Sequence, residues 1–297
     1  MPPDPSAIHI PVMRDEVLQW LQPTATGLYV DGTLGLGGHT QALLEETAPS
    51  GRVIGFEWDE DAAAKAAERL AGYGDRLWIV RASYAALVPE LSRLGVTGID
   101  GLVADLGVSS LQLDQAERGF SFRTDHALDM RMDRRNPTTA AHLVARLAEE
   151  QLADIFYHYG EERQARRIAR FLVEARQEAA VATTGQLAAI VAAAVPKKYH
   201  PPRVHVATKV FQALRIAVNG ELDNLTKLLA TAPEALAPGA RICIITFHSL
   251  EDRIVKQTFL QNPAYAVLTK RPIEPSRTEM QQNPRARSAK LRVAARI

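Results

Sequence analysis

The feature that most constrains the fold of this chain is a short apolar run that opens into a glycine-rich turn. The run covers residues 28–31, and the turn that follows contains Gly32, Gly35, Gly37 and Gly38. A strand, a glycine turn and a helix in this order direct backbone N–H groups and the positive end of the helix toward a ligand. Glycine permits the unusual dihedral angles and the close backbone approach that such a turn requires. The segment therefore predicts the first strand, turn and helix of an α/β sheet.

Short β-rich runs alternate with helical patterns along most of the remaining chain, which is typical of βαβ units in a parallel sheet. Helices are predicted over residues 40–47, 61–70 and 250–260. Strands are predicted over residues 28–31, 52–57, 77–80, 100–105, 241–247, 264–270 and 291–295. Between about 112 and 218 the pattern is helical, with no convincing strand. We therefore expect a discontinuous α/β domain, residues 1–111 and 219–297, that is interrupted by an inserted helical domain, residues 112–218.

Composition excludes several classes of protein. The single cysteine, Cys243, rules out an intramolecular disulfide and a thiolate metal cluster, and its apolar surroundings predict a buried, inert thiol. No apolar stretch reaches the roughly 20 residues that span a bilayer. Residues 1–5 lack the basic and apolar regions of a signal peptide. A cytoplasmic protein without membrane segments is the resulting expectation.

Local charge is more informative than the net charge of +1. Residues 163–215 contain ten Lys or Arg against two Glu, and five further basic residues follow Glu279 without another acid. Basic zones on a neutral protein suggest a phosphate-rich partner, and Arg163, Arg166 and Arg170 are the candidate contacts. A solvated helix face would show the same pattern, so charge alone leaves both interpretations open.

A carboxylate at the end of the second predicted strand indicates an adenosine ligand. Glu57 stands 20 residues after Gly37 and can accept two hydrogen bonds from a ribose diol. This arrangement fits both a dinucleotide and S-adenosylmethionine. Thr40 stands where the third glycine of the dinucleotide pattern would be, which favours S-adenosylmethionine. Asp31 before the turn and Asp105 after the fourth strand favour it too, because both can face its cationic methionine end. A tight turn without a ligand is the ordinary alternative.

The ends of the predicted strands carry the candidate reaction centre. In open α/β sheets the ligand crevice lies beyond the carboxyl ends of the strands, where Asp31, Glu57, Asp105 and His248 all stand. Asp105 and His248 are the candidate catalytic residues. The structural alternatives are a turn or helix-capping role for Asp105 and a backbone hydrogen bond for His248. No metal site is expected.

The segment that follows the fourth predicted strand mixes aromatic and basic side chains. Phe120 and Phe122 are candidates to stack on a base, and Arg118 and Arg123 are candidates to hold phosphates. In the alternative interpretation, the two phenylalanines anchor the insertion to the sheet.

Seven motifs occur in an order that resembles one known family. They cover residues 31–39, 105–110, 118–122, 128–133, 159–163, 246–253 and 283–288. Together they resemble the ribosomal RNA small-subunit methyltransferase H family, and the likeness extends from about His9 to Arg296. It implies a class I (Rossmann-like) methyltransferase sheet with an inserted all-helical domain. It also implies N4-methylation, dependent on S-adenosylmethionine, of a cytidine in the decoding region of 16S rRNA in the small (30S) ribosomal subunit.

The resemblance also assigns residues by position. The implied cofactor residues, together with the two that the glycine turn suggests, are Asp31, Gly35, Gly37, Gly38, His39, Glu57, Tyr84, Asp105 and Gln112. Glu57 replaces the usual aspartate, and Tyr84 replaces a frequent phenylalanine. The segment before residue 283 is also short, which can trim an RNA-facing loop. The oligomeric state stays open, with a homodimer as one option.

The target amine needs a hydrogen-bond acceptor because its lone pair is delocalised into the cytosine ring. N4-methyltransferases that act on DNA usually carry a Ser/Asp-Pro-Pro-aromatic motif after the fourth strand, whereas this chain has Asp-Leu-Gly-Val from Asp105. We expect Asp105, or a backbone carbonyl just after it, to accept the hydrogen bond, with His248 as the second candidate. A nicotinamide-dependent oxidoreductase and a non-catalytic RNA-binding module remain the competing classes.

Overall fold

The computed structural model describes residues 11–202 and 204–297. Residues 1–5, His9 and Arg203, which the sequence analysis used, lie outside this part. The chain divides into two compact units. The first combines Met1–Gly107 with Leu222–Ile297, and the second is Val108–Glu221.

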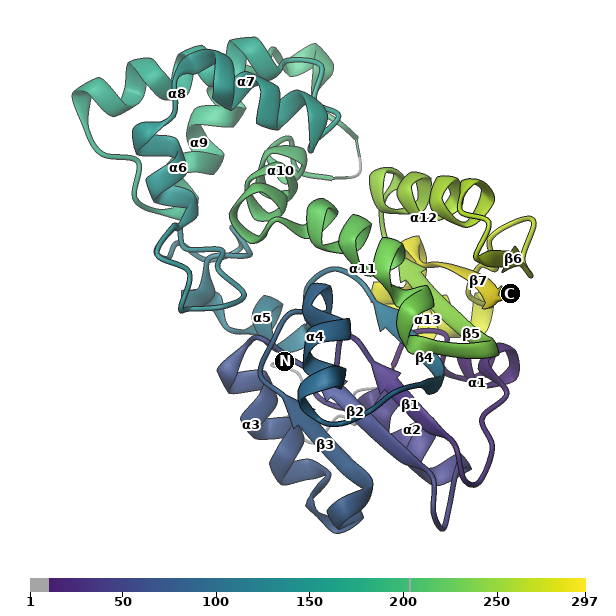
Figure 1. Cartoon of the computed structure of the whole chain (residues 1–297). Helices are drawn as coiled ribbons and strands as arrows, with labels where there is room; N and C mark the ends of the chain where they lie inside the picture. Colours follow the sequence, from purple (N-terminus) through teal and green to yellow (C-terminus); the bar gives the residue numbers. More distant parts are fainter. Residues whose placement is uncertain (1–10, 203) are drawn as a thin grey trace. The chain divides into compact units, whose positions relative to one another are not determined.

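The first unit contains a seven-stranded sheet in the order β3-β2-β1-β4-β5-β7-β6 (Figure 1). Its strands are β1 (Leu28–Asp31), β2 (Arg52–Phe56), β3 (Leu77–Val80), β4 (Ile99–Asp105), β5 (Leu236–Thr246), β6 (Tyr265–Val267) and β7 (Lys290–Arg296). The five strands β1 to β5 pair in parallel, and β7 runs antiparallel to both β5 and β6. The expected α/β class is confirmed, and each predicted strand is present, although β5 begins at Leu236 rather than Arg241 and β6 ends at Val267 rather than Lys270.

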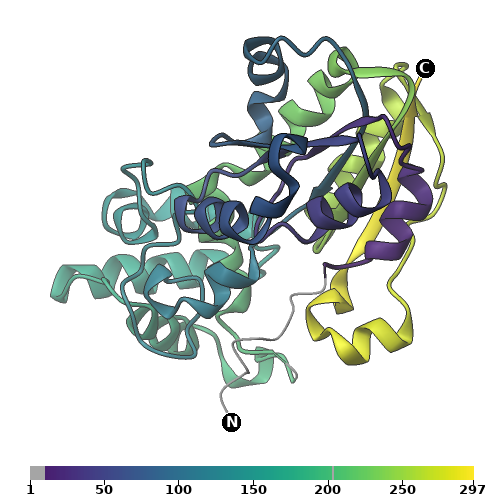
Figure 2. The same cartoon turned by 90° about the horizontal axis from the view of Figure 1, so that it is seen from below.

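Helices cover both faces of this sheet (Figure 2). The apolar residues of α4 (Leu87–Arg93), α11 (Glu221–Ala235) and α12 (Ser249–Gln261) pack on one face with Val30 and Ile54. Those of α1 (Arg14–Leu21) and α2 (Gly38–Glu46) pack on the other face with Tyr29 and Val53. Neighbouring residues of one strand thus enter opposite cores. This two-sided burial explains why the strands read as continuous apolar runs.

Helices α3 (Glu60–Arg69) and α13 (Arg277–Gln282) complete the helices of the first unit. Helix α3 begins at Asp59, whose side chain accepts hydrogen bonds from the backbone N–H groups of Asp61 and Ala62. Its apolar side packs with Leu34 of the glycine turn. Helix α13 precedes β7. The Glu279 side chain of α13 accepts a hydrogen bond from the Met13 backbone N–H at 2.7 Å, which ties α13 to the start of α1.

The second unit is helical, as expected. Its helices are α5 (Ser110–Asp114), α6 (Ala140–Arg146), α7 (Glu149–His158), α8 (Ala165–Glu178), α9 (Thr184–Ala194) and α10 (Thr208–Asn219). Within the described part of this unit the only β-type contact is the isolated bridge between Ala127 and Thr183. In α8, Ala165, Ile168 and Leu172 are buried at helical spacing, so Arg166, Arg167 and Arg170 are left on the outer face.

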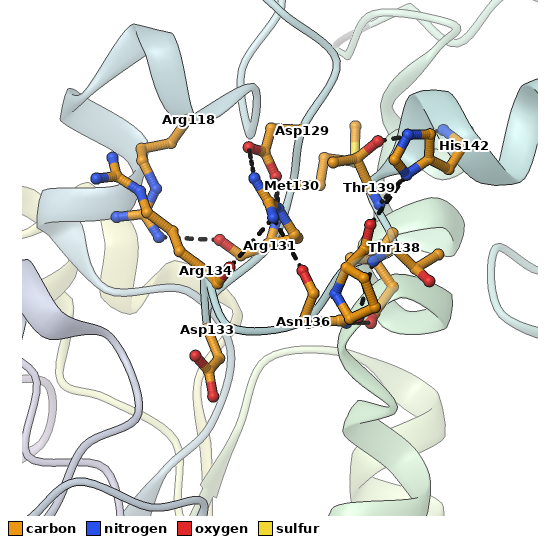
Figure 3. Close-up of polar contacts among 12 residues, drawn as sticks. Arg118, Asp129, Met130, Arg131, Asp133, Arg134, Asn136, Thr138, Thr139 and His142 are labelled. Atoms are coloured by element: carbon orange, nitrogen blue, oxygen red, sulfur yellow. Dashed lines mark hydrogen bonds and ion pairs between the residues drawn. The ribbon is translucent and has the colours of Figure 1, made fainter.

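A loop between Gly119 and Thr139 is held by side chains rather than by regular structure (Figure 3). Arg131 donates from Nε and Nη2 to the two carboxylate oxygens of Asp129, at 2.6 and 2.8 Å. Burial alone would raise the pKa of Asp129, but the hydrogen bonds from Arg131 outweigh it and hold that pKa below its usual value. Arg131 also donates from Nη1 to the Asn136 carbonyl. The bidentate pair therefore fixes the course of this loop.

Asn219, at the end of α10, fastens the same loop to the helices. Its Oδ1 accepts from the Met132 backbone N–H, and its Nδ2 donates to the Met130 carbonyl, both at 2.8 Å. Met130 is fully buried and has a left-handed φ of 63°. Residue types that rarely adopt this conformation do so only when their surroundings enforce it, so the loop is tightly determined by its contacts.

Among residues 11–202 and 204–297, no helix is both long enough and apolar enough to cross a bilayer. The same ranges contain no group of three or more His, Cys, Asp or Glu placed to hold a metal ion. Cys243 is fully buried in β5, and burial raises the pKa of its thiol.

Candidate active site

Four candidate side chains stand at one edge of the sheet in the first unit. Asp31 and Asp105 are the last residues of β1 and β4. Glu57 directly follows β2, and Tyr84 begins a short 3₁₀ helix after β3. Because these strands are parallel neighbours, their carboxyl ends lie at the same edge. The fold thus brings together residues that are more than 70 positions apart in the sequence.

The glycine turn is tied to both neighbours of β1. The Gly32 N–H donates to the Val103 carbonyl of β4 at 2.8 Å, and the Leu34 N–H donates to the Phe56 carbonyl of β2 at 3.0 Å. Gly37 has a φ of 82° and precedes α2, and a Cβ there would lie 2.5 Å from Leu70 Cδ1. The position therefore requires glycine for both its dihedral angle and its close contact.

Asp31 holds the turn from inside. Its carboxylate is fully buried, and its two oxygens accept from the Thr33 N–H at 3.0 Å and from Thr40 Oγ1 at 2.8 Å. Burial raises the pKa of Asp31, although His39 and Thr40 act in the opposite direction. The hydrogen bonds of Thr33 and Thr40 to Asp31 were not predicted from the sequence, although hydroxyl residues close to a buried acid can indicate such bonds. A contact between Asp31 and a cofactor stays a prediction.

Asp105 and His39 present two buried polar atoms without a hydrogen-bond partner among the described residues. These atoms are Asp105 Oδ1 and His39 Nε2. His39 Nε2 lies 3.8 Å from the other Asp105 oxygen, which is too far for a hydrogen bond. The Asp105 backbone N–H donates to Thr33 Oγ1 at 2.6 Å, which anchors the end of β4 to the glycine turn. Buried polar atoms in native structures rarely lack partners, so this pair indicates a place where a ligand binds.

His39 carries a positive charge more readily than an ordinary histidine. Burial by itself would lower its pKa, but Asp105 and Asp31 outweigh the burial and raise it. An imidazolium between two carboxylates offsets part of the cost of burying them.

Glu57 is buried against the glycine turn. Its Oε2 accepts from the Gly35 N–H at 2.8 Å, and its Oε1 accepts from the Asp59 N–H at 2.9 Å. Burial raises the pKa of Glu57 to about 7, although both backbone N–H groups lower it. Each carboxylate oxygen can accept a second hydrogen bond, so the side chain can still receive a hydroxyl pair.

The raised pKa of Glu57 predicts a pH-dependent stability. Because the pKa of about 7 in the folded protein exceeds the ordinary value of 4.5, protonation favours the folded state. The contribution of protonated Glu57 to the free energy of unfolding is present below pH 4.5 and is lost as the pH rises to about 7. We expect the free energy of unfolding to fall by about 3 kcal/mol over this range from Glu57 alone.

Urea unfolding at several pH values tests this prediction. Glu57→Gln should remove the Glu57 share of the slope, whereas Glu60→Gln, at an exposed position in the first turn of α3, should keep it. Equal slopes in the wild type and in Glu57→Gln would contradict the assignment.

His248 takes part in a helix cap. Its Nδ1 accepts from the Glu251 N–H at 3.4 Å, and Glu251 Oε2 accepts from the Phe247 N–H at 2.8 Å. His248 Nε2 lies 3.2 Å from Glu251 Oε1, but the angles do not form a hydrogen bond. With Nδ1 as an acceptor, the neutral ring carries its proton on Nε2. If Nδ1 took a further proton, it could no longer accept the hydrogen bond from the Glu251 N–H, and the helix cap would be lost. The geometry therefore supports the structural alternative more than a catalytic role. The catalytic role of His248 stays a prediction.

Gln112 belongs to the second unit. Its Oε1 accepts from the Ser109 N–H at 3.0 Å, and its own N–H donates to Ser109 Oγ at 3.3 Å. This reciprocal pair caps α5 and explains why a glutamine stands there. Its cofactor role stays a prediction.

The expected RNA contacts of Arg118 and Phe120 are wrong. Arg118 is 2% exposed, and its Nη2 donates to the carbonyls of Arg131 and Met132 at 2.9 and 3.1 Å. Phe120 is 9% exposed, with its ring centre 6.0 Å from the Arg118 guanidinium carbon. Arg118 supports the loop of Figure 3 from within, and Phe120 is buried beside it, so neither side chain offers a surface to a nucleic acid.

The remaining candidates lie closer to the surface. The half-buried Phe122 ring contacts His205 and Phe211, with centroid distances of 4.8 and 4.7 Å. Both partners belong to the helical unit, so these contacts are not the expected anchor to the sheet. Arg163, Arg166 and Arg170 are exposed, and Arg170 lies 3.7 Å from Glu174. Their contact with RNA stays a prediction.

Comparisons with known proteins find close relatives in sequence and more distant likenesses among solved structures. The chain is 55% identical to the ribosomal RNA small subunit methyltransferase H of Desulfotalea psychrophila, over 99% of this chain and 100% of that protein. It is 49% identical to the protein of the same name from Sorangium cellulosum, over 97% and 91%. A solved SAM-dependent O-methyltransferase from Thermotoga maritima aligns with a TM-score of 0.44 and 11% identity, over 96% of this chain and 64% of that one.

The family model agrees with these relatives and with the expected resemblance. The model described as the MraW methylase family matches residues 6–297. Its match includes the glycine turn, the strand-end acids and the whole helical unit. The chain therefore belongs to the MraW methylase family.

Proposed function

We propose that this protein transfers a methyl group from S-adenosylmethionine to N4 of a cytidine in the decoding region of 16S rRNA. The name of the relatives supports a small-subunit rRNA substrate. The observation that carries the proposal is the Asp105 carboxylate, which ends β4 with a buried oxygen that lacks a hydrogen-bond partner among the described residues. Such an oxygen suits the N–H groups of an amine.

The strand ends fit the cofactor. S-adenosylmethionine is the methyl donor of this fold and family, and its sulfonium supplies an electrophilic methyl group. The Glu57 carboxylate can receive the ribose hydroxyls. The glycine turn offers a close backbone approach at Gly35 and Gly37, and the unsatisfied Asp105 and His39 atoms can receive polar groups of the ligand. Donor and acceptor types therefore match the groups that the cofactor presents.

The chain's own part in the reaction is to hold and deprotonate the target nitrogen. In the transfer, an N–C bond forms, the S–C bond to the methyl breaks and one N4 proton leaves. Asp105, or a backbone carbonyl just after it, accepts a hydrogen bond from the amine. The leaving proton passes to the Asp105 carboxylate, directly or through water, with His248 as the second candidate acceptor. The base must leave any stack to reach this point, at a cost of a few kcal/mol. Orientation of the nitrogen against the methyl supplies much of the acceleration.

Basic side chains of the helical unit would hold the RNA backbone. Reversal of charge in the double variant Arg166→Glu and Arg170→Glu is expected to weaken RNA binding and to reduce its salt dependence, because fewer counterions are released. Binding measured by fluorescence anisotropy at several salt concentrations checks this. Arg93→Glu, at an exposed position on α4 of the other unit, is the matched control. An unchanged salt slope in the double variant would count against these contacts.

The function is tested with 30S subunits that lack the modification. The protein should transfer radiolabelled methyl groups from S-adenosylmethionine to these particles, and S-adenosylmethionine rather than NAD should raise its Tm. Stabilisation by NAD alone would indicate an oxidoreductase, and RNA affinity without methyl transfer would indicate a binding module. The same assay with free 16S rRNA decides which form is the substrate. A cytoplasmic location is part of the proposal, and the oligomeric state stays open, with a homodimer as one option.

A further inference from the structure

A basic surface that includes Arg166 and Arg170 lies where helix α8 approaches a 3₁₀ helix of the helical unit. We call it the α8–η4 surface and define it by Arg166, Arg167 and Arg170 of α8 and by the 3₁₀ helix η4 (Lys197–Tyr199). The Arg167 guanidinium donates through Nε to the Ala194 carbonyl at the end of α9, which η4 follows after two residues. This bond brings the start of α8 beside η4.

The α8–η4 surface is uniformly positive. The first two turns of α8 contain Arg166, Arg167 and Arg170 and no acid, and residues 195–199 add Lys197 and Lys198 without an acid. All five side chains are exposed. Glu174, one turn further along α8, is the acid paired with Arg170 at 3.7 Å. Positive charge from two elements thus gathers where a polyanion can bind.

An exposed aromatic ring stands inside this positive surface. The Tyr199 side chain is 54% exposed, and Lys198 Nζ lies 5.0 Å from the centre of its ring. The turn that carries it is fixed, because the Tyr199 N–H donates to the Pro196 carbonyl at 2.8 Å and the His200 ring contacts the Val195 carbonyl at 2.9 Å. A rigid, exposed ring among cations is the combination that binds single-stranded nucleic acid by base stacking and phosphate contact.

We propose that the α8–η4 surface binds a single-stranded segment of the rRNA, with one base stacked on Tyr199. Arg166, Arg170, Lys197 and Lys198 contact the adjoining phosphates, while Arg167 ties α8 to α9. The inference rests on the proposed rRNA substrate and adds how the RNA outside the methylated base is held. Stacking on a tyrosine tolerates any base, so this surface contributes affinity rather than sequence selection.

The test compares variants at Tyr199 in binding to a fluorescent single-stranded oligoribonucleotide. Tyr199→Ala should raise the Kd about tenfold, whereas Tyr199→Trp and Tyr199→Phe should keep it near the wild-type value. The double variant Lys197→Ala and Lys198→Ala should lower the slope of log affinity against log salt by about 1.4. Tyr157→Ala is the matched control, because Tyr157 on α7 is 59% exposed and has the acidic Asp154 one turn before it on the same helix.

Each outcome separates this inference from the proposed function. If the wild type methylates 30S subunits but Tyr199→Ala binds RNA as tightly as Tyr157→Ala, the inference is wrong and the function stands. If Tyr199→Ala loses affinity for 30S subunits but not for the RNA alone, the surface contacts a ribosomal protein and the inference is also wrong. A loss of RNA affinity in Tyr199→Ala supports it, even if methyl transfer to 30S subunits fails.

Discussion

Asp105→Asn is expected to lower the rate of methyl transfer by about a hundredfold to ten-thousandfold at saturating S-adenosylmethionine. Asparagine preserves the size of the side chain and one acceptor oxygen, but it cannot accept a proton as a carboxylate does. The backbone bond from Asp105 to Thr33 and the strand pairing opposite Ile245 do not involve the side chain, so the end of β4 should keep its place. Single-turnover kinetics on 30S subunits measures the effect on the chemical step.

Two controls make the Asp105 result interpretable. Because Asp105 is also a predicted cofactor residue, the Kd for S-adenosylmethionine must be measured by calorimetry for the same variant. Asp100→Asn changes an exposed carboxylate near the opposite end of β4, which accepts from the Leu28 N–H, and should leave turnover unchanged. Near-normal turnover of Asp105→Asn with saturated cofactor would contradict the proposed role.

The second large effect is expected from Gly119→Ala, which should destabilise the helical unit by about 3 kcal/mol or more. Gly119 has a φ of 74°, and an added Cβ would lie 2.4 Å from the Ala127 carbonyl oxygen and 2.8 Å from the Asp129 backbone nitrogen. Both are main-chain atoms of the loop in Figure 3, so neither can rotate away. The loop must shift, and the Asp129 pair with Arg131 shifts with it.

Hydrogen exchange measures this effect separately in the two units. Amides of α6 to α10 should lose protection in Gly119→Ala, while those of β1 to β5 should keep theirs. Gly72→Ala is the control, because no atom lies within 4 Å of the added Cβ and Gly72 has no positive φ. Unchanged protection of the helical unit in Gly119→Ala would show that the loop tolerates the extra atom.

The sheet was predictable because its signals are local. Strands buried on both faces appear as short apolar runs, and β1 and β3 begin and end where the sequence analysis placed them. The end of β4 was predictable for the same reason. The longer β5, which begins at Leu236 rather than Arg241, was not, because Pro238 and Gly239 conceal its first residues.

The site was only partly predictable because some of its contacts join distant residues. The positions of Asp31, Glu57 and Asp105 follow from the strand pattern. The burial of Arg118 does not, since it depends on the carbonyls of Arg131 and Met132 in a loop without a periodic pattern. Likewise, no local signal links Glu279 to Met13, which are 266 positions apart. A sequence motif of arginine and phenylalanine looks like an RNA contact whether the arginine side chain faces solvent or the protein interior.

The position of the methyl group on the modified base tests the central proposal most directly. 30S subunits that lack the modification are incubated with the protein and S-adenosylmethionine, and the 16S rRNA is digested to nucleosides for mass spectrometry. The account predicts N4-methylcytidine from a single site in the decoding region, with none formed by Asp105→Asn. A methyl group on carbon 5 of the cytosine, on a ribose or on another base would contradict it.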